Sequence, residues 1–153
     1  MTDLAKLRDL SGPERRWLAL CLLATPVVVI GLGTFGFARM RSWLQRWPGR
    51  RAPESRGPQD AERARAIARV VGVAGGRGPV HATCLRRALL LSWILRREGI
   101  ASALRIGVRR EGDELFAHAW VEHDGIPLGE DDDPALRYSA FDRNFGVTAD
   151  ARR

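Results

Sequence analysis

Two side chains of this 153-residue sequence could act together as a nucleophile and its base, namely Cys84 and His118. The apolar periodicity after a glycine-rich stretch predicts a helix over Thr83–Glu98, with Cys84 in its first turn. The free backbone N–H groups and the dipole of that turn favour a thiolate, and the arginines that follow add positive charge. The same N–H groups, that of Cys84 foremost, could hold an oxyanion. Cys84 is therefore a candidate for acyl-transfer chemistry, provided that a base lies within reach.

His118 is the candidate base. It lies in the middle of a predicted strand over residues 115–122, on the same face as Trp120 and Glu122. A strand histidine cannot meet a helix cysteine locally, so the pair must form across the boundary between helix and sheet. A small buried cysteine and an ordinary half-buried histidine are the alternatives that these residue types leave open.

A carboxylate should hold the far ring nitrogen of His118, so that the imidazole adopts the tautomer that a base requires. The acidic run at 130–133 follows a predicted hairpin turn that returns the chain toward the level of His118. Glu122 shares the His118 face, but four residues of strand separate the two by ~13 Å. We therefore expect Glu130 or Asp131 to be the third member of the site.

Metal binding is a competing use for the same residue types. His81, Cys84, His118 and His123 could be imagined as a zinc site. However, His118 and His123 are five residues apart, so on one strand they would point to opposite faces, and His123 falls in a predicted turn. We expect neither a metal nor another cofactor. Cys21 lies far from Cys84 in unlike surroundings, which excludes a disulfide framework and a Cys-only zinc site.

The elements that must position these groups change in type along the chain. The apolar pattern over residues 60–74 predicts a helix with Asp60 as its N-cap. Gly99 is placed to end the second helix, which carries Cys84. Strands are predicted over 102–109, 115–122 and 126–128, with turns at 112–113 and 124–125. Helices followed by consecutive strands predict an α+β fold with an antiparallel sheet.

Residues 18–38 contain no charged side chain and are long enough to cross a bilayer. Proline and glycine weaken a continuous helix there, and arginines at both ends give no preferred orientation. Two interpretations stay open: a pair of apolar helices broken near Pro26 and packed on the rest of the protein, which we favour, or a true span. A short helical piece and a linker rich in Pro, Gly and Arg over 40–60 then divide the chain into an N-terminal segment, 1–58, and a domain over 59–153.

The charge is distributed unevenly along the chain. The net charge is +7 and the pI is about 11.0, which would ordinarily suggest a nucleic-acid partner. The arginines are scattered among apolar, helix-like runs, with no run of five Lys or Arg and no nucleic-acid binding motif. Residues 111–153 carry the opposite excess, with 11 acidic and 4 basic side chains. The pattern therefore argues against nucleic-acid binding.

Two stretches resemble the lasso-peptide leader peptidases, which are small transglutaminase-like cysteine proteases: ATCLRRALLLSWILRREGIASALRIGVRR and FAHAWVEHDGIPLGE. The resemblance covers about residues 60–131, and the apolar, Arg-flanked N-terminal segment is also similar to that family. It implies a papain/transglutaminase-like core with a Cys–His–Asp triad, in which Cys84 matches the nucleophile and His118 the base. The third position matches Glu130, where the family usually has Asp, and Asp131 is the nearest substitute.

The same resemblance implies a substrate and partners. The substrate would be the leader of a ribosomally made precursor peptide, and the partners a separate leader-recognition protein and an ATP-dependent lasso cyclase, in the cytoplasm. Membrane association through residues 18–38 is left open. Two rival interpretations remain. The same site could transfer an acyl group to an amine, as transglutaminases do, or the protein could be a membrane-associated scaffold whose Arg-rich first 110 residues dock acidic partners.

Overall fold

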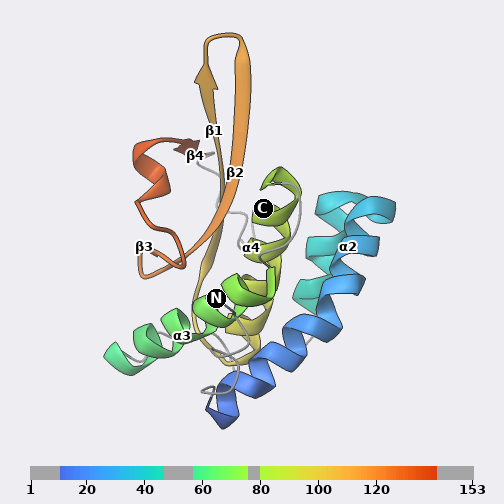
Figure 1. Cartoon of the computed structure of the whole chain (residues 1–153), viewed down its shortest axis with the longest axis vertical. Coiled ribbons are helices and arrows are strands. Elements are labelled where there is room, and N and C mark those ends of the chain that lie inside the picture. The colour runs from blue at the N-terminus through green and yellow to red at the C-terminus, as the bar shows by residue number, and fades with distance from the viewer. Residues whose placement is uncertain (1–10, 47–56, 76–79, 141–153) are drawn as a thin grey trace, which may run out of the picture.

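The structure, a computed structural model, describes residues 11–46, 57–75 and 80–140. Within these ranges helices come first and strands follow, with one 3-10 helical turn before the last strand (Figure 1). In chain order the elements are α2 (Gly12–Arg46), α3 (Pro58–Gly75), α4 (Val80–Arg97), β1 (Ala103–Glu111), β2 (Glu114–His123), β3 (Ile126–Pro127), η1 (Pro134–Leu136) and β4 (Ser139–Ala140).

The strands form one antiparallel sheet in the order β3-β2-β1-β4. β1 and β2 make a long hairpin in which Gly107 lies opposite His118. β4 then pairs with β1 at Gly107 and Val108, so the chain after the acidic run returns to the level of His118. α4 packs against β2, and α2 lies on the side of α4 away from the sheet (Figure 1). The predicted α+β class with an antiparallel sheet is confirmed.

α3 and α4 both begin earlier than predicted. α4 begins at Val80 rather than Thr83, so Cys84 lies in its second turn instead of its first. α3 begins at Pro58, and Asp60 is a first-turn residue rather than the N-cap. Proline suits the first turn because its φ is already helical and the N–H that it lacks would have no partner there. Both starts precede the apolar periodicity from which they were predicted.

The end of α4 is as predicted, with Gly99 in the left-handed conformation at a φ of 77°. The Gly99 N–H donates to the Arg96 carbonyl over 3.1 Å, and the Ile100 N–H donates to the Leu95 carbonyl over 2.9 Å. This pair of bonds is a Schellman motif, which satisfies the last helical carbonyls and turns the chain toward β1.

α2 runs through Pro26 and kinks at Gly36, where φ is 74°. The prediction of a break near Pro26 is therefore wrong. Proline removes one helical N–H donor, the one that would bond to the Leu22 carbonyl, yet the helix continues through it. The Thr25 hydroxyl donates to the Cys21 carbonyl over 2.6 Å, within the same turn. Glycine adopts positive φ at little cost, so the chain turns back at Gly36. The arm over 37–46 then brings the Met40 sulfur to the place that a side chain at Gly31 would fill.

The hydrophobic core joins all three helices to the sheet. One face of α2 contributes Trp17, Cys21 and Val28, which are almost fully buried.

By length and composition, Gly12–Leu44 is also a helix that could cross a membrane. The division of the chain at residue 58 stays a prediction, because most of the expected linker, 47–56, lies outside the described residues.

Candidate active site

Cys84 and His118 meet where α4 packs on β2, and their side chains form a hydrogen bond. Cys84 is half-buried, and His118 lies midway along β2 with its ring facing the helix. The contact joins residues 34 positions apart in the chain, which requires the helix and the strand to be packed as they are. The pairing expected from residue type and strand face is therefore present in the geometry.

Glu130 is the third side chain of the site, so that Cys84, His118 and Glu130 form a row of hydrogen-bonded side chains. Its Oε2 lies 3.1 Å from Nε2 of His118, and each side chain is about one-fifth exposed. Because Nε2 is engaged by the carboxylate, Nδ1 is the ring nitrogen left for the Cys84 thiol. A base held in this way has a fixed tautomer and a fixed ring orientation.

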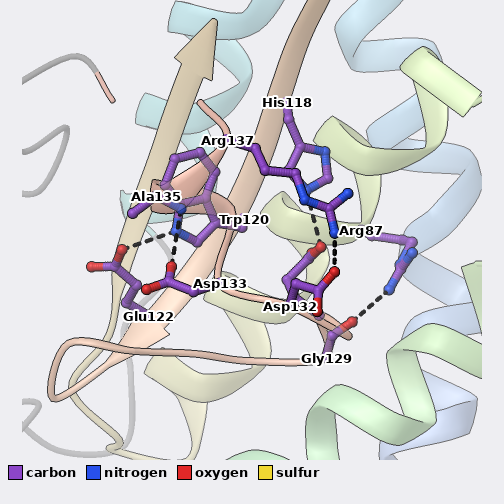
Figure 2. Close-up of polar contacts among 10 residues, drawn as sticks. Arg87, His118, Trp120, Glu122, Gly129, Asp132, Asp133, Ala135 and Arg137 are labelled. Carbon is purple, nitrogen blue, oxygen red and sulfur yellow. Dashed lines mark hydrogen bonds and ion pairs between the residues drawn. The ribbon is translucent and has the colours of Figure 1, made fainter. Parts of the chain in front are cut away.

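The loop that carries Glu130 is tied to the cysteine helix. Gly129, which precedes Glu130, has a φ of 70° and is therefore at a position that favours glycine. Arg87 of α4 donates to the Gly129 carbonyl over 3.3 Å, as Figure 2 shows. Arg87 is one of the two arginines after Cys84 that were expected only to add positive charge, and its bond to Gly129 also holds the carboxylate loop against the helix.

The other acidic residues of the run have different contacts. Asp133 accepts a hydrogen bond from the Ala135 N–H over 2.9 Å and caps η1, and Asp132 forms an ion pair with Arg137 (Figure 2). Asp131 is exposed. Among the described residues, Glu130 is thus the carboxylate that is bonded to His118, and the alternative expected at Asp131 is not brought into that contact.

Electrostatics favour a charged form of the pair. Burial alone would raise the pKa of the Cys84 thiol. Burial is outweighed by the hydrogen bond to His118, by the backbone N–H groups of Ala119 and Leu85 and by the His118 charge, so the pKa lies below its ordinary value. The bonds to Cys84 and to Glu130 raise the pKa of His118 to about 9, against an opposing effect of burial. At neutral pH both shifts favour a thiolate beside an imidazolium, which is the reactive form of a Cys–His pair.

His118 is also enclosed by two aromatic rings. The Trp120 ring is stacked at 6.0 Å between centroids, and the Tyr138 ring lies at 5.2 Å. A Cβ on Gly107, opposite His118, would lie 2.9 Å from the Tyr138 Cβ and 3.1 Å from the Trp120 ring. Glycine is thus required at 107, because Tyr138 and Trp120 approach its backbone too closely for a side chain, and both rings can then pack beside the imidazole.

Glu122 has a role at a distance from the imidazole. It accepts a hydrogen bond from the Trp120 indole over 2.9 Å, as Figure 2 shows. It also pairs with Arg105 over 2.9 Å. These bonds direct the Glu122 carboxylate to Trp120 and Arg105, consistent with its expected separation from His118 along the strand. Neither Tyr138 nor this Trp120–Glu122–Arg105 chain was predicted, although the alternation of β2 already placed Trp120 and Glu122 on the His118 face.

No group of three or more His, Cys, Asp or Glu residues that could hold a metal ion occurs within the described ranges. His123, expected in a turn, is instead the last residue of β2 and is buried. Its Nδ1 lies 2.7 Å from the Ala101 carbonyl. Cys84, His118 and Glu130 together provide a thiol, an imidazole and a carboxylate, which suit nucleophilic acyl transfer.

A comparison with models of protein families matches residues 30–142 to the transglutaminase-like superfamily. The chain belongs to this superfamily. The matched part includes all three side chains of the row, and membership indicates an enzyme of the cysteine peptidase or acyltransferase type. Comparisons with curated proteins and with solved structures gave no match.

The pKa of His118 predicts the alkaline limb of activity in this transglutaminase-like protein. The reactive form needs a protonated His118, whose pKa is raised from 6.5 to about 9, so kcat/KM should fall as pH rises through about 9. Glu130→Gln removes a hydrogen bond and a charge that raise this pKa, so the limb should move to lower pH. A pH–rate profile of both proteins measures the shift, and coincident limbs would contradict the contact with Glu130.

Proposed function

We propose that the protein is a cysteine peptidase that removes the leader from a ribosomally made lasso-peptide precursor. The observation that carries the chemistry is the row formed by Cys84, His118 and Glu130, in which a thiol of lowered pKa lies beside an imidazole held by a carboxylate. Superfamily membership supports acyl transfer of this kind. The choice of substrate is supported by the resemblance of two sequence stretches to the leader peptidases.

In the proposed mechanism the Cys84 thiolate attacks the carbonyl at the junction between leader and core. The imidazolium of His118 gives its proton to the leaving amine as the tetrahedral intermediate collapses. Neutral His118 then activates a water molecule, which hydrolyses the thioester and releases the leader. Glu130 holds the ring through both steps and stabilises its charged form.

The oxyanion needs backbone donors beside the sulfur. The sequence pointed to the Cys84 N–H, and this stays a prediction. Because Cys84 is the fifth residue of α4, its N–H is at a position that ordinarily bonds within the helix. The Ala119 N–H, which is directed at the sulfur, is a second candidate donor that the sequence did not suggest.

A pocket of about 220 Å³ lies beside the row and could admit part of the substrate. Its lining includes His118, Glu130, Arg137 and Tyr138, together with the rest of the acidic run. The leader-recognition protein would present the precursor here, and the ATP-dependent cyclase would take up the freed core. Both partners, and the cytoplasmic location of the reaction, belong to the proposal and rest on the resemblance.

Product mass tests the proposal and separates it from its enzymatic rival. The purified protein is incubated with a precursor peptide and its leader-recognition protein, with and without a primary amine in excess. Hydrolysis yields leader and core whose summed mass exceeds that of the precursor by one water, whereas acyl transfer yields a leader carrying the amine. Formation of the amine adduct alone would favour the transglutaminase-type rival. Cleavage that persists without Cys84 would favour the non-enzymatic scaffold.

A further inference from the structure

α2 is apolar on the side that faces solvent as well as on the side that packs in the core. Four large side chains of its first arm, residues 12–35, are more than half exposed: Leu22, Leu23, Ile30 and Phe35. No charged residue occurs between Arg16 and Arg39. A surface helix normally presents a polar face to water, and a helix that is apolar all round is covered by protein or by lipid. The exposed face of α2 therefore needs a partner.

The second arm of α2 adds basic residues beside this face. A groove of about 860 Å³ between the two arms is lined by apolar side chains such as Ile30, Phe35 and Trp43 and by Arg39 and Arg46. Both arginines are exposed. The sequence contains no Asp or Glu from residue 15 to residue 53. An apolar face with basic neighbours and no acidic ones complements a bilayer that carries anionic headgroups.

We propose that α2 docks face-on against an anionic lipid bilayer, with its exposed apolar side in the lipid and its buried side still packed on α3 and α4. The inference does not rest on the peptidase reaction. The sheet lies across α4 from α2, so docking would leave the Cys84–His118 site on the water side (Figure 1).

Packing against the charged helices argues against a span. Trp17, Cys21 and Val28 are buried in the core, and Arg16 of α2 is paired with Glu98 at the end of α4 over 2.7 Å. If α2 crossed the bilayer in this arrangement, arginines of α3 and α4 would enter the hydrocarbon, where each costs ~2.5–3.5 kcal/mol on insertion scales. The turn at Gly36 also ends the first arm and returns the chain along it. Face-on docking keeps those charges in water.

The same charges argue against a second copy of the chain as the occupant. In a dimer through this face, Arg39 and Arg46 of each copy would meet a surface that carries the same basic residues and no acidic residue to pair with them. Like charges at such an interface oppose association. Anionic headgroups remove that repulsion, which is why we favour a lipid surface.

Flotation of the full chain with vesicles tests the proposal. The protein should float with phosphatidylcholine vesicles that contain phosphatidylglycerol and remain largely unbound with phosphatidylcholine alone. Binding should weaken as salt rises, because the electrostatic part of the attraction is screened. Failure of the folded protein to float with anionic vesicles would overturn the proposal.

Two variants probe the apolar and the basic parts separately. Leu22→Glu/Leu23→Glu should lower vesicle binding at least tenfold, whereas Leu115→Glu on the exposed hairpin should not, since Leu115 is 68% exposed and far from α2. Arg39→Gln/Arg46→Gln should lower binding to anionic vesicles by about fivefold per arginine and leave the apolar packing intact. Unchanged flotation of either double variant would contradict face-on docking.

Extraction and oligomeric state distinguish docking on a bilayer from a membrane span and from a second copy of the chain. Washing membranes of expressing cells with carbonate at high pH should release the protein, and retention in the pellet would indicate a span instead. A monomer–dimer equilibrium that Leu22→Glu/Leu23→Glu abolishes, without vesicle binding by the unaltered protein, would assign the face to a second copy. Peptide cleavage measured in solution is a separate readout, so loss of cleavage and loss of docking are distinguishable.

Discussion

Cys84→Ala is expected to abolish peptide cleavage, with a loss of at least ~10⁴-fold in kcat. The thiol is the group that forms the covalent intermediate, and removal of the nucleophile of a comparable acyl-transfer site costs ~10⁶ in kcat. The environment supports this assignment, since the pKa of the Cys84 thiol lies below its ordinary value through its bonds to His118 and backbone N–H groups, despite burial. Single-turnover cleavage of a precursor peptide, followed by mass spectrometry, measures the effect.

Cys21→Ala is the matched control for the same experiment. Cys21 is fully buried in the face of α2 that packs in the core, and burial raises the pKa of its thiol to about 11. It is therefore neutral at physiological pH and has no access to substrate. Cys21→Ala should retain most of the activity, with a modest loss of stability from the small cavity. Equal rates for Cys84→Ala and the unaltered protein would refute the cysteine-peptidase proposal.

Glu130→Gln should slow cleavage by roughly ten- to a thousandfold, or ~1.4–4 kcal/mol of barrier. The amide keeps the shape of the side chain but loses the charge that stabilises the imidazolium and can leave the ring in the wrong tautomer. The same change in a serine-protease triad costs ~10⁴ in turnover. A thiol ionises more readily than a hydroxyl and depends less on the third group, so we expect a smaller loss here. Single-turnover rates at neutral pH report the chemical step directly.

Asp131→Asn is the control for Glu130→Gln, because it removes a neighbouring charge without touching the imidazole. Glu130 is 3.1 Å from Nε2 of His118, whereas Asp131 is exposed. We expect a change of less than about threefold for Asp131→Asn, since a solvent-screened charge contributes little. If Asp131→Asn were the slower variant, the third member would be Asp131 and the loop would close differently in the working enzyme.

The row of Cys84, His118 and Glu130 could be predicted because each step follows a local rule. Strand alternation fixes the face of β2 on which His118 lies, and turn residues after β2 bring the chain back beside it. The sequence could not separate Glu130 from Asp131, because a shift of one residue in the loop exchanges them. Packing decides the shift, through the Arg87 contact with Gly129 that holds the loop on α4.

Features that depend on tertiary contacts alone were missed or misplaced. β4 pairs at only two residues after an irregular stretch, so no periodicity marks it or brings Tyr138 to His118. The break in α2 was expected near Pro26, yet the chain turns at Gly36. Gly31, Gly33 and Gly36 look alike in sequence, and the packing of Met40 on Gly31 is compatible with a turn only at the last of them.

The unequal environments of the two thiols make Cys84 the more sensitive of the two to oxidants. The thiolate favoured at Cys84 is the form that attacks hydrogen peroxide, giving a sulfenic acid and hydroxide, whereas the neutral, buried Cys21 is protected. Cys21 is enclosed in the core and is not available to resolve that sulfenic acid as an internal disulfide. Recovery from oxidation would therefore depend on an external thiol, and preparations kept without reductant should lose activity while remaining folded.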